Sequence, residues 1–259
     1  MVPKAFLSWS SGKDCAFALI EAHRLGLVNI VGVLTTINET YDRVVQHGTQ
    51  SSVLDMQIAA LGLPCVKVGL PPDCTMALYE QRITTALNHI KAQGVEHIVY
   101  GDLFLDDVRA SRDALLAKVG MSGIYPLWKR DTAALADAMI NAGIVAHVVC
   151  LDPRHLSRDY AGRQFDRAFL RALPPGVDPC GENGEFHTAV SAGPMFRHPI
   201  AIEVGPTVER GGSFSPIWLR QQPWGENSIS SVISRVELGG FPSVFCRAVR
   251  HEVGHSAQG

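Results

Sequence analysis

The sequence has no long hydrophobic run and little charge. No stretch of its 259 residues reaches the about 20 consecutive apolar residues that a membrane-spanning helix needs. Its start has no charged segment followed by an apolar block, so we expect a cytoplasmic location. Charged residues make up 19% of the chain, and the formal net charge is −2 at pH 7. Because tight binding of a long nucleic acid needs a basic face, we expect neither nucleic-acid nor membrane partners.

Paired cysteines, internal repeats and low-complexity tracts are missing too. The six cysteines include no CxxC spacing, so neither a zinc ribbon nor a thioredoxin-like redox site is indicated. What remains is a chain long enough to bury roughly 70–75% of the surface that its unfolded form would expose. We therefore expect a full hydrophobic core without disulfides or a structural metal.

Apolar runs alternate with amphipathic stretches along the first 152 residues. This alternation predicts β–α units around a parallel sheet. The expected strands span residues 5–9, 30–37, 65–68, 97–103 and 144–151. The expected helices span residues 14–27, 48–61, 75–93 and 131–142, with Gly26 and Gly94 at helix ends. We predict an α/β fold with an open, doubly wound, Rossmann-like parallel sheet, and ligands at the C-terminal edge of that sheet.

The pattern changes after residue 152, which we take as the end of a nucleotide-binding domain, residues 1–152. Residues 153–220 are rich in proline and glycine, contain a short helix candidate at 163–172, and are expected to form a smaller substrate-binding lobe. From Ile200 onward the sequence alternates like a strand pair that turns at Gly211-Gly212. Residues 221–259 have no clear period and stay unassigned.

A short polar turn, SSGKDC at residues 10–15, joins the first expected strand to the first expected helix. Such a turn aims backbone N–H groups and the positive end of the helix dipole at one point, which suits a polyphosphate. Lys13 adds a charge that can stabilise a departing pyrophosphate. A Walker-type P-loop is excluded, because Leu7 and Asp14 stand where that motif needs Gly and Ser or Thr. The alternative is an ordinary strand-to-helix turn in which one of the two serines caps the helix.

A second candidate segment is CGENGEFHT at residues 180–188. Gly181 and Gly184 allow unusual φ angles, so Glu182 and Glu185 can point into one small space. Two carboxylates held close together can bind Mg²⁺, bind an ammonium ion or remove a proton from it. The alternative is a solvated acidic loop.

Three segments in this order resemble one family, the ATP pyrophosphatases of the PP-loop (adenine nucleotide alpha hydrolase-like) superfamily. The resemblance is to the diphthine–ammonia ligase-like group and its bacterial relatives. SSGKDC is similar to the family's SGGKDS, with Ser11 in place of Gly and Cys15 in place of Ser. GDLFLDDVR at 101–109 matches next, followed by YPLWKRD at 125–131, and CGENGEFHT resembles CGEGGEYET. His187 replaces the acidic residue usual in the ligases proper, a departure that bears on the substrate.

The resemblance implies an ATP-dependent amide ligase. Such an enzyme adenylates a substrate carboxylate, releases pyrophosphate and transfers the acyl group to ammonia or another amine. The implied cofactors are ATP and Mg²⁺, and the implied partners are a carboxylate on a small molecule or a protein, and ammonium. We expect free ammonium because no glutaminase segment is visible in the sequence. Two alternatives stay open: a non-catalytic ATP or AMP sensor of the same superfamily, and a tRNA-thiolating enzyme, which the single Cys15 and the net charge of −2 disfavour.

The site residues follow from these motifs and from the resemblance. The predicted catalytic residues are Lys13, Asp14, Glu182 and Glu185. The predicted nucleotide-binding residues are Ser8, Ser10, Ser11, Gly12, Lys13, Asp14, Cys15, Thr35, His47, Gly101, Asp102 and Arg109. The predicted substrate-binding residues are Gly181, Glu182, Asn183, Gly184, Glu185, His187 and Thr188. Asp14 and Asp102 are the predicted Mg²⁺ ligands.

One further motif, HEVGH at residues 251–255, fits the HExxH pattern of zinc proteases. We reject a zinc site there, because no third ligand follows in the sequence and Gly254 weakens the helix that the motif needs.

Overall fold

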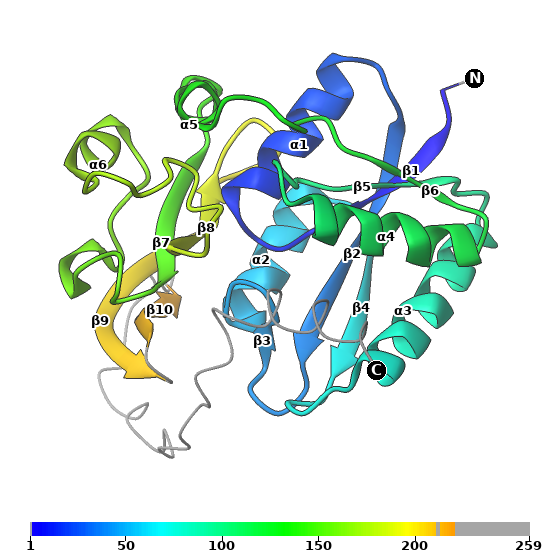
Figure 1. Cartoon of the computed structure of the whole chain (residues 1–259), viewed down its shortest axis with the longest axis horizontal. Helices are drawn as coiled ribbons and strands as arrows, with labels where there is room; N and C mark the ends of the chain where they lie inside the picture. Colours follow the sequence, from blue (N-terminus) through cyan, green and yellow to red (C-terminus); the bar gives the residue numbers. More distant parts are fainter. Residues whose placement is uncertain (1, 211–212, 221–259) are drawn as a thin grey trace, which may run out of the picture.

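The computed structural model describes residues 2–210 and 213–220, which form two β-sheets with helices packed on them (Figure 1). The first sheet is built from residues 4–124. Its elements are β1 (Lys4–Ser8), α1 (Lys13–Arg24), β2 (Asn29–Asn38), β3 (Arg43–Val44), α2 (Ser51–Leu61), β4 (Cys65–Leu70), α3 (Met76–Lys91), β5 (His97–Val99), α4 (Asp106–Lys118) and β6 (Ser122–Ile124). The strands β4, β2, β1, β5 and β6 pair in parallel, and the short β3 pairs antiparallel with the end of β2. The predicted α/β class is confirmed.

Successive side chains of β1 point to opposite faces of the parallel sheet, as the period of a strand requires. Ala5 and Leu7 belong to a core that includes buried residues of α1 and α2. Phe6 belongs to a second core, which includes buried residues of α3 and α4. Helices therefore cover both faces, which is the doubly wound arrangement that the alternation of strands and helices predicts.

The order in which strands are added to the sheet reverses at β1. β2 lies on one side of β1 and continues to β4, whereas β5 and β6 lie on the other side. In sheets of this kind, ligands bind in the crevice beyond the C-terminal ends of the two central strands, where the strand order reverses. That crevice is bounded here by residues 9–12, after β1, and by residues 100–105, after β5.

The second sheet is antiparallel and has the strand order β8-β7-β10-β9. Its elements are α5 (Thr132–Asn141), β7 (Val145–Leu151), the 3-10 helix η1 (Arg158–Tyr160), α6 (Arg167–Ala172), β8 (Phe186–Ala192), β9 (Ile202–Arg210) and β10 (Ser213–Arg220). The expected strand at 144–151 exists, but its expected place in the parallel sheet is wrong, because β7 pairs antiparallel with β8. An apolar run predicts a buried strand without identifying its partner. The division of the chain at residue 152 stays a prediction.

The other expected elements lie close to their predicted positions. The four expected helices are found as α1, α2, α3 and α5, and Gly26 and Gly94 follow α1 and α3 with φ angles of 62° and 79°. The expected strand pair is found as β9 and β10, which pair antiparallel. Gly211-Gly212 and the HEVGH motif lie outside the described residues. Among the helices that the structure describes, none is both long and apolar enough to cross a membrane.

Candidate functional site

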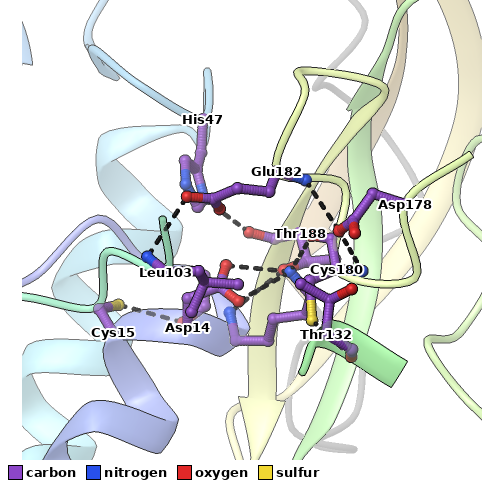
Figure 2. A network of polar contacts seen from close by, with 11 residues as sticks. Asp14, Cys15, His47, Leu103, Thr132, Asp178, Cys180, Glu182 and Thr188 are labelled. Carbon is purple, nitrogen blue, oxygen red and sulfur yellow. Dashed lines mark hydrogen bonds and ion pairs between the residues drawn. The ribbon is translucent and has the colours of Figure 1, made fainter. Parts of the chain in front are cut away.

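A pocket of about 190 Å³ lies at the crevice where the strand order reverses. Its walls come from four segments of the chain, within residues 8–15, 45–47, 101–112 and 180–188. Figure 2 shows how side chains from these segments approach one another across it. The pocket thus joins the end of the parallel sheet to the loop that leads into the second sheet.

The loop 10–15 leads directly into α1, whose first residue is Lys13. Gly12 is the N-cap residue and makes no side-chain capping bond, so the alternative of a serine-capped turn is wrong. Ser11 adopts a left-handed φ of 73°, which is uncommon for a residue other than glycine. The Lys13 N–H donates to Thr188 Oγ1 at 3.1 Å, which ties the helix start to β8. The first turn of α1 therefore faces the pocket at a fixed orientation.

Gly12 is needed because the loop passes very close to His47. A Cβ atom at position 12 would lie 2.2 Å from His47 Cε1 and 2.6 Å from His47 Nδ1. The His47 ring stacks on His187, with 4.8 Å between the ring centroids. Burial, the neighbouring His187 and the Lys13 cation hold the pKa of His47 well below its ordinary value. His47 is therefore a neutral imidazole whose Nδ1 donates to the Thr188 carbonyl at 2.9 Å, because a carbonyl oxygen only accepts.

The Lys13 side chain is almost fully buried, yet its charge is retained. Its Nζ lies 2.9 and 3.0 Å from the two Asp14 carboxylate oxygens and donates to the Cys180 carbonyl at 2.5 Å. Burial alone lowers the pKa of Lys13, but the Asp14 carboxylate and the other nearby acidic groups outweigh burial and raise it. The site therefore holds a permanent cation beside the positive end of α1.

Glu182 reaches the same pocket from the loop that precedes β8 (Figure 2). Its Oε1 accepts a hydrogen bond from the Leu103 N–H at 3.3 Å. Burial, and secondly the Asp14 carboxylate, raise the pKa of Glu182 to about 8, against the opposing effect of Lys13. Gly181 and Gly184 adopt the predicted unusual φ angles, 69° and 86°. A carboxyl that titrates near neutral pH is suited to exchanging a proton with a bound ligand.

Asp102 lines the pocket beside Arg112, a residue that the sequence did not single out. Arg112 Nε lies 3.2 Å from Asp102 Oδ2, and the guanidinium lies 4.3 Å from the centre of the Tyr100 ring. Burial raises the pKa of Asp102, Arg112 opposes that shift, and the nearby Asp14 carboxylate adds to it. Two carboxylates, Asp14 and Asp102, therefore face one space and repel each other across it.

Most of the predicted site residues come together in this pocket. Those that line it are Ser8, Ser10, Lys13, Asp14, Cys15, His47, Gly101, Asp102, Gly181, Glu182, Asn183, Gly184, His187 and Thr188. Ser11 and Gly12 lie buried behind its wall, and Thr35 is buried in β2. The pocket residues that the sequence analysis missed are Val45, Gln46, Leu105, Val108, Arg112, Cys180 and Phe186.

Besides Ser11, Gly12 and Thr35, two more predicted site residues, Arg109 and Glu185, lie outside the pocket lining. The Arg109 guanidinium lies against the rings of Tyr125 and Trp128, 4.5 and 4.7 Å from their centres, and its Nε lies 3.5 Å from Asp113 Oδ2. Glu185 is 1% exposed, and its Oε1 accepts from the Asp178 N–H at 3.0 Å and from Asn183 Nδ2 at 3.2 Å. In this structure Glu185 shapes the loop that carries Glu182, and the arginine that faces the pocket is Arg112.

Comparisons with known proteins identify relatives of the chain. Residues 131–218 match the family described as "Diphthamide synthase C-terminal domain". The chain is 25% identical to the diphthine–ammonia ligase of Danio rerio over 232 residues, which cover 80% of this chain and 90% of that protein. It is 26% identical to the diphthine–ammonia ligase of Homo sapiens over 129 residues, which cover 48% of each protein. Over 223 residues it is 22% identical to the diphthine–ammonia ligase of Schizosaccharomyces pombe, and spans 36% of that longer protein.

Proposed function

We propose that this chain, a member of the diphthine–ammonia ligase-like family, is an ATP-dependent ligase that adenylates a carboxylate and joins it to ammonia or another amine. One observation carries the proposal. The buried Lys13 cation and the start of α1 share a single pocket with Glu182, a carboxyl whose pKa is raised to about 8. The pocket thus combines a site for anionic phosphates with a group that can take a proton from an amine.

The loop 10–15 and Lys13 are proposed to hold the β and γ phosphates of ATP. A substrate carboxylate then attacks the α phosphorus, the bond from that phosphorus to the β-phosphate oxygen breaks, and pyrophosphate leaves. Negative charge grows on the departing group in this step, so a fixed cation and oriented N–H groups stabilise the transition state more than the bound ATP. Lys13 is already held in place by Asp14 and Cys180, and little reorganisation is needed as the reaction proceeds.

The residues of the pocket fit a Mg²⁺ ion bound together with the nucleotide. Mg²⁺ is usually held by one or two carboxylates and by substrate phosphates rather than by a cage made of protein alone. Asp14 and Asp102 face each other closely enough for the Asp14 carboxylate to raise the pKa of Asp102. The ion would neutralise phosphate charge and the repulsion between these carboxylates.

Glu182 is proposed to act on the incoming amine. Ammonium must lose a proton before its nitrogen can attack the acyl-adenylate and displace AMP. A carboxyl with a pKa of about 8 is a stronger base than an ordinary glutamate, which titrates near 4.5, and it is partly ionised at neutral pH. The Leu103 N–H holds its Oε1, so the second oxygen is left to receive the proton.

The two cysteines that line the pocket do not favour the thiolation alternative. Burial raises the pKa of the Cys15 thiol to about 11, and burial also raises the pKa of Cys180. The thiolate is the reactive form of cysteine, and both residues stay protonated at neutral pH. Sulfur transfer through either residue is therefore disfavoured.

The proposal is tested by product analysis. The protein is incubated with ATP, Mg²⁺ and a panel of carboxylic acids, with and without ammonium. We expect AMP and pyrophosphate, with amide formed only when ammonium is present, and loss of amide formation in the Glu182→Gln variant. ADP and phosphate as the sole products would contradict the proposal, and nucleotide binding without any product across the panel would favour the sensor alternative.

A further inference from the structure

We propose that Gln57 is a positioning residue that fixes the loop 10–15 for binding ATP; this inference rests on the function proposed above. Gln57 lies on α2, 0% exposed, and does not line the pocket. Its side chain nevertheless reaches the backbone of that loop. The residue has no part in the chemistry, and it acts through Ser11.

The Gln57 amide uses both of its N–H donors and its carbonyl oxygen. Its Oε1 accepts from Trp9 Nε1 at 3.0 Å, and its Nε2 donates to the Ser11 carbonyl at 3.0 Å and to the Val190 carbonyl at 2.8 Å. Because the Trp9 indole N–H only donates and both carbonyls only accept, the network itself settles which end of the amide is oxygen. A glutamine in this position is thus matched to three partners from three different segments.

The three partners of Gln57 lie on segments that must be aligned for the pocket to bind ATP. Trp9 follows β1, Ser11 forms the loop, and Val190 belongs to β8, whose Thr188 accepts the N–H of Lys13. The Ser11 carbonyl also accepts from the Val190 N–H at 3.0 Å, so both of its lone pairs are used. Gln57 therefore joins the parallel sheet, the loop and the second sheet at one point.

The backbone of Ser11 explains why such a clamp is needed. Its φ of 73° is the left-handed conformation, which costs a residue with a Cβ atom energy that glycine does not lose. Ser11 is held there by the two bonds to its carbonyl and by the 2.7 Å bond between its Oγ and Thr49 Oγ1. Without the Gln57 bond the loop can relax, and the N–H groups at the start of α1 then lose their common direction.

The test compares Gln57→Met, which keeps the side-chain volume, with Gln57→Glu, which keeps the acceptor for Trp9 and loses the amide donors. Ser51→Ala is the control, because Ser51 is buried on the same helix and its Oγ has no hydrogen-bond partner among the described residues. ATP affinity is measured by calorimetry and thermal stability is measured separately. We expect both Gln57 variants to bind ATP at least about tenfold more weakly than the wild type, with an unchanged KM for the carboxylic acid substrate. Ser51→Ala should bind ATP like the wild type.

A second background separates positioning from packing. In Ser11→Gly the left-handed conformation carries no steric cost, so Gln57→Met should weaken ATP binding by only about two- to threefold there. If the folded Gln57 variants keep wild-type ATP affinity and lose only thermal stability, Gln57 is a packing residue and the inference is overturned. If instead the wild-type protein does not bind ATP at all, the proposed function fails first, and the inference fails with it.

Discussion

The substitution Glu182→Gln is expected to stabilise the protein at neutral pH while removing its activity. Glutamine keeps the shape of the protonated carboxyl and can still accept from the Leu103 N–H. Burial raises the pKa of Glu182 from 4.5 to about 8 in the folded protein. Between these values the unfolded chain has lost the proton and the folded protein still holds it. The free energy of unfolding therefore falls as pH rises through this window.

The size of the effect follows from the shift. One unit of pKa difference corresponds to about 1.4 kcal/mol, so between pH 5.5 and 7.5 the wild type should lose about 2 to 3 kcal/mol relative to the variant. Urea unfolding of both proteins at the two pH values measures this difference, because every other titrating group is shared. In the same variant we expect kcat/KM for amide formation to fall at least about a hundredfold, the usual contribution of a general base. If the free energies of unfolding of the two proteins change by the same amount between pH 5.5 and 7.5, the account of Glu182 is refuted.

Three further outcomes are expected. Gly12→Ala should destabilise the protein by about 1–3 kcal/mol through overpacking against His47, and by less in a His47→Ala background, as a thermal double-mutant cycle would show; additive effects would contradict the contact. Arg112→Met should lower the free energy of unfolding by about 1.5–3 kcal/mol, because it removes the charged partner of the largely buried Asp102. Arg109→Met should lower the free energy of unfolding by about 1 kcal/mol or less, because Arg109 lies against two aromatic rings and makes a half-exposed ion pair with Asp113. Equal losses for the two arginine variants in urea unfolding would contradict this difference.

The β–α order of the first 124 residues could be predicted because its strands are short apolar runs bounded by helices with an apolar face. The partner of β7 could not be predicted, since a run such as residues 145–151 suits a parallel or an antiparallel neighbour equally well. α4 was missed because its sequence is largely polar and only Leu116 is buried, so no apolar stripe marks it.

The loop 10–15 and the segment 180–188 could be predicted as parts of the site, because small residues and charged residues so close together in sequence are seldom needed for the fold alone. Which charged residue faces the pocket depends on helix and strand geometry that the sequence did not reveal. Arg109 and Arg112 lie three positions apart on α4, a helix that the sequence analysis did not predict. Glu185 immediately precedes β8, and its side chain accepts a hydrogen bond from the Asp178 N–H of the preceding loop instead of reaching the pocket. Gln57 had one sequence signal, a lone polar amide among apolar residues in the middle of α2, and by itself that signal names no partner.

The most direct measurement of the central claim is a calorimetric titration of ATP and of pyrophosphate into the wild type, Lys13→Met and Lys118→Met. Lys118 is the control, because it is an exposed lysine on α4 that pairs with Glu80 far from the loop. The loss of a charged hydrogen bond, about 1.5–3 kcal/mol, predicts that Lys13→Met binds both ligands about 10- to 150-fold more weakly and that Lys118→Met binds them like the wild type. Equal affinity of all three proteins for both ligands would contradict the claim that this loop holds the outer phosphates of ATP.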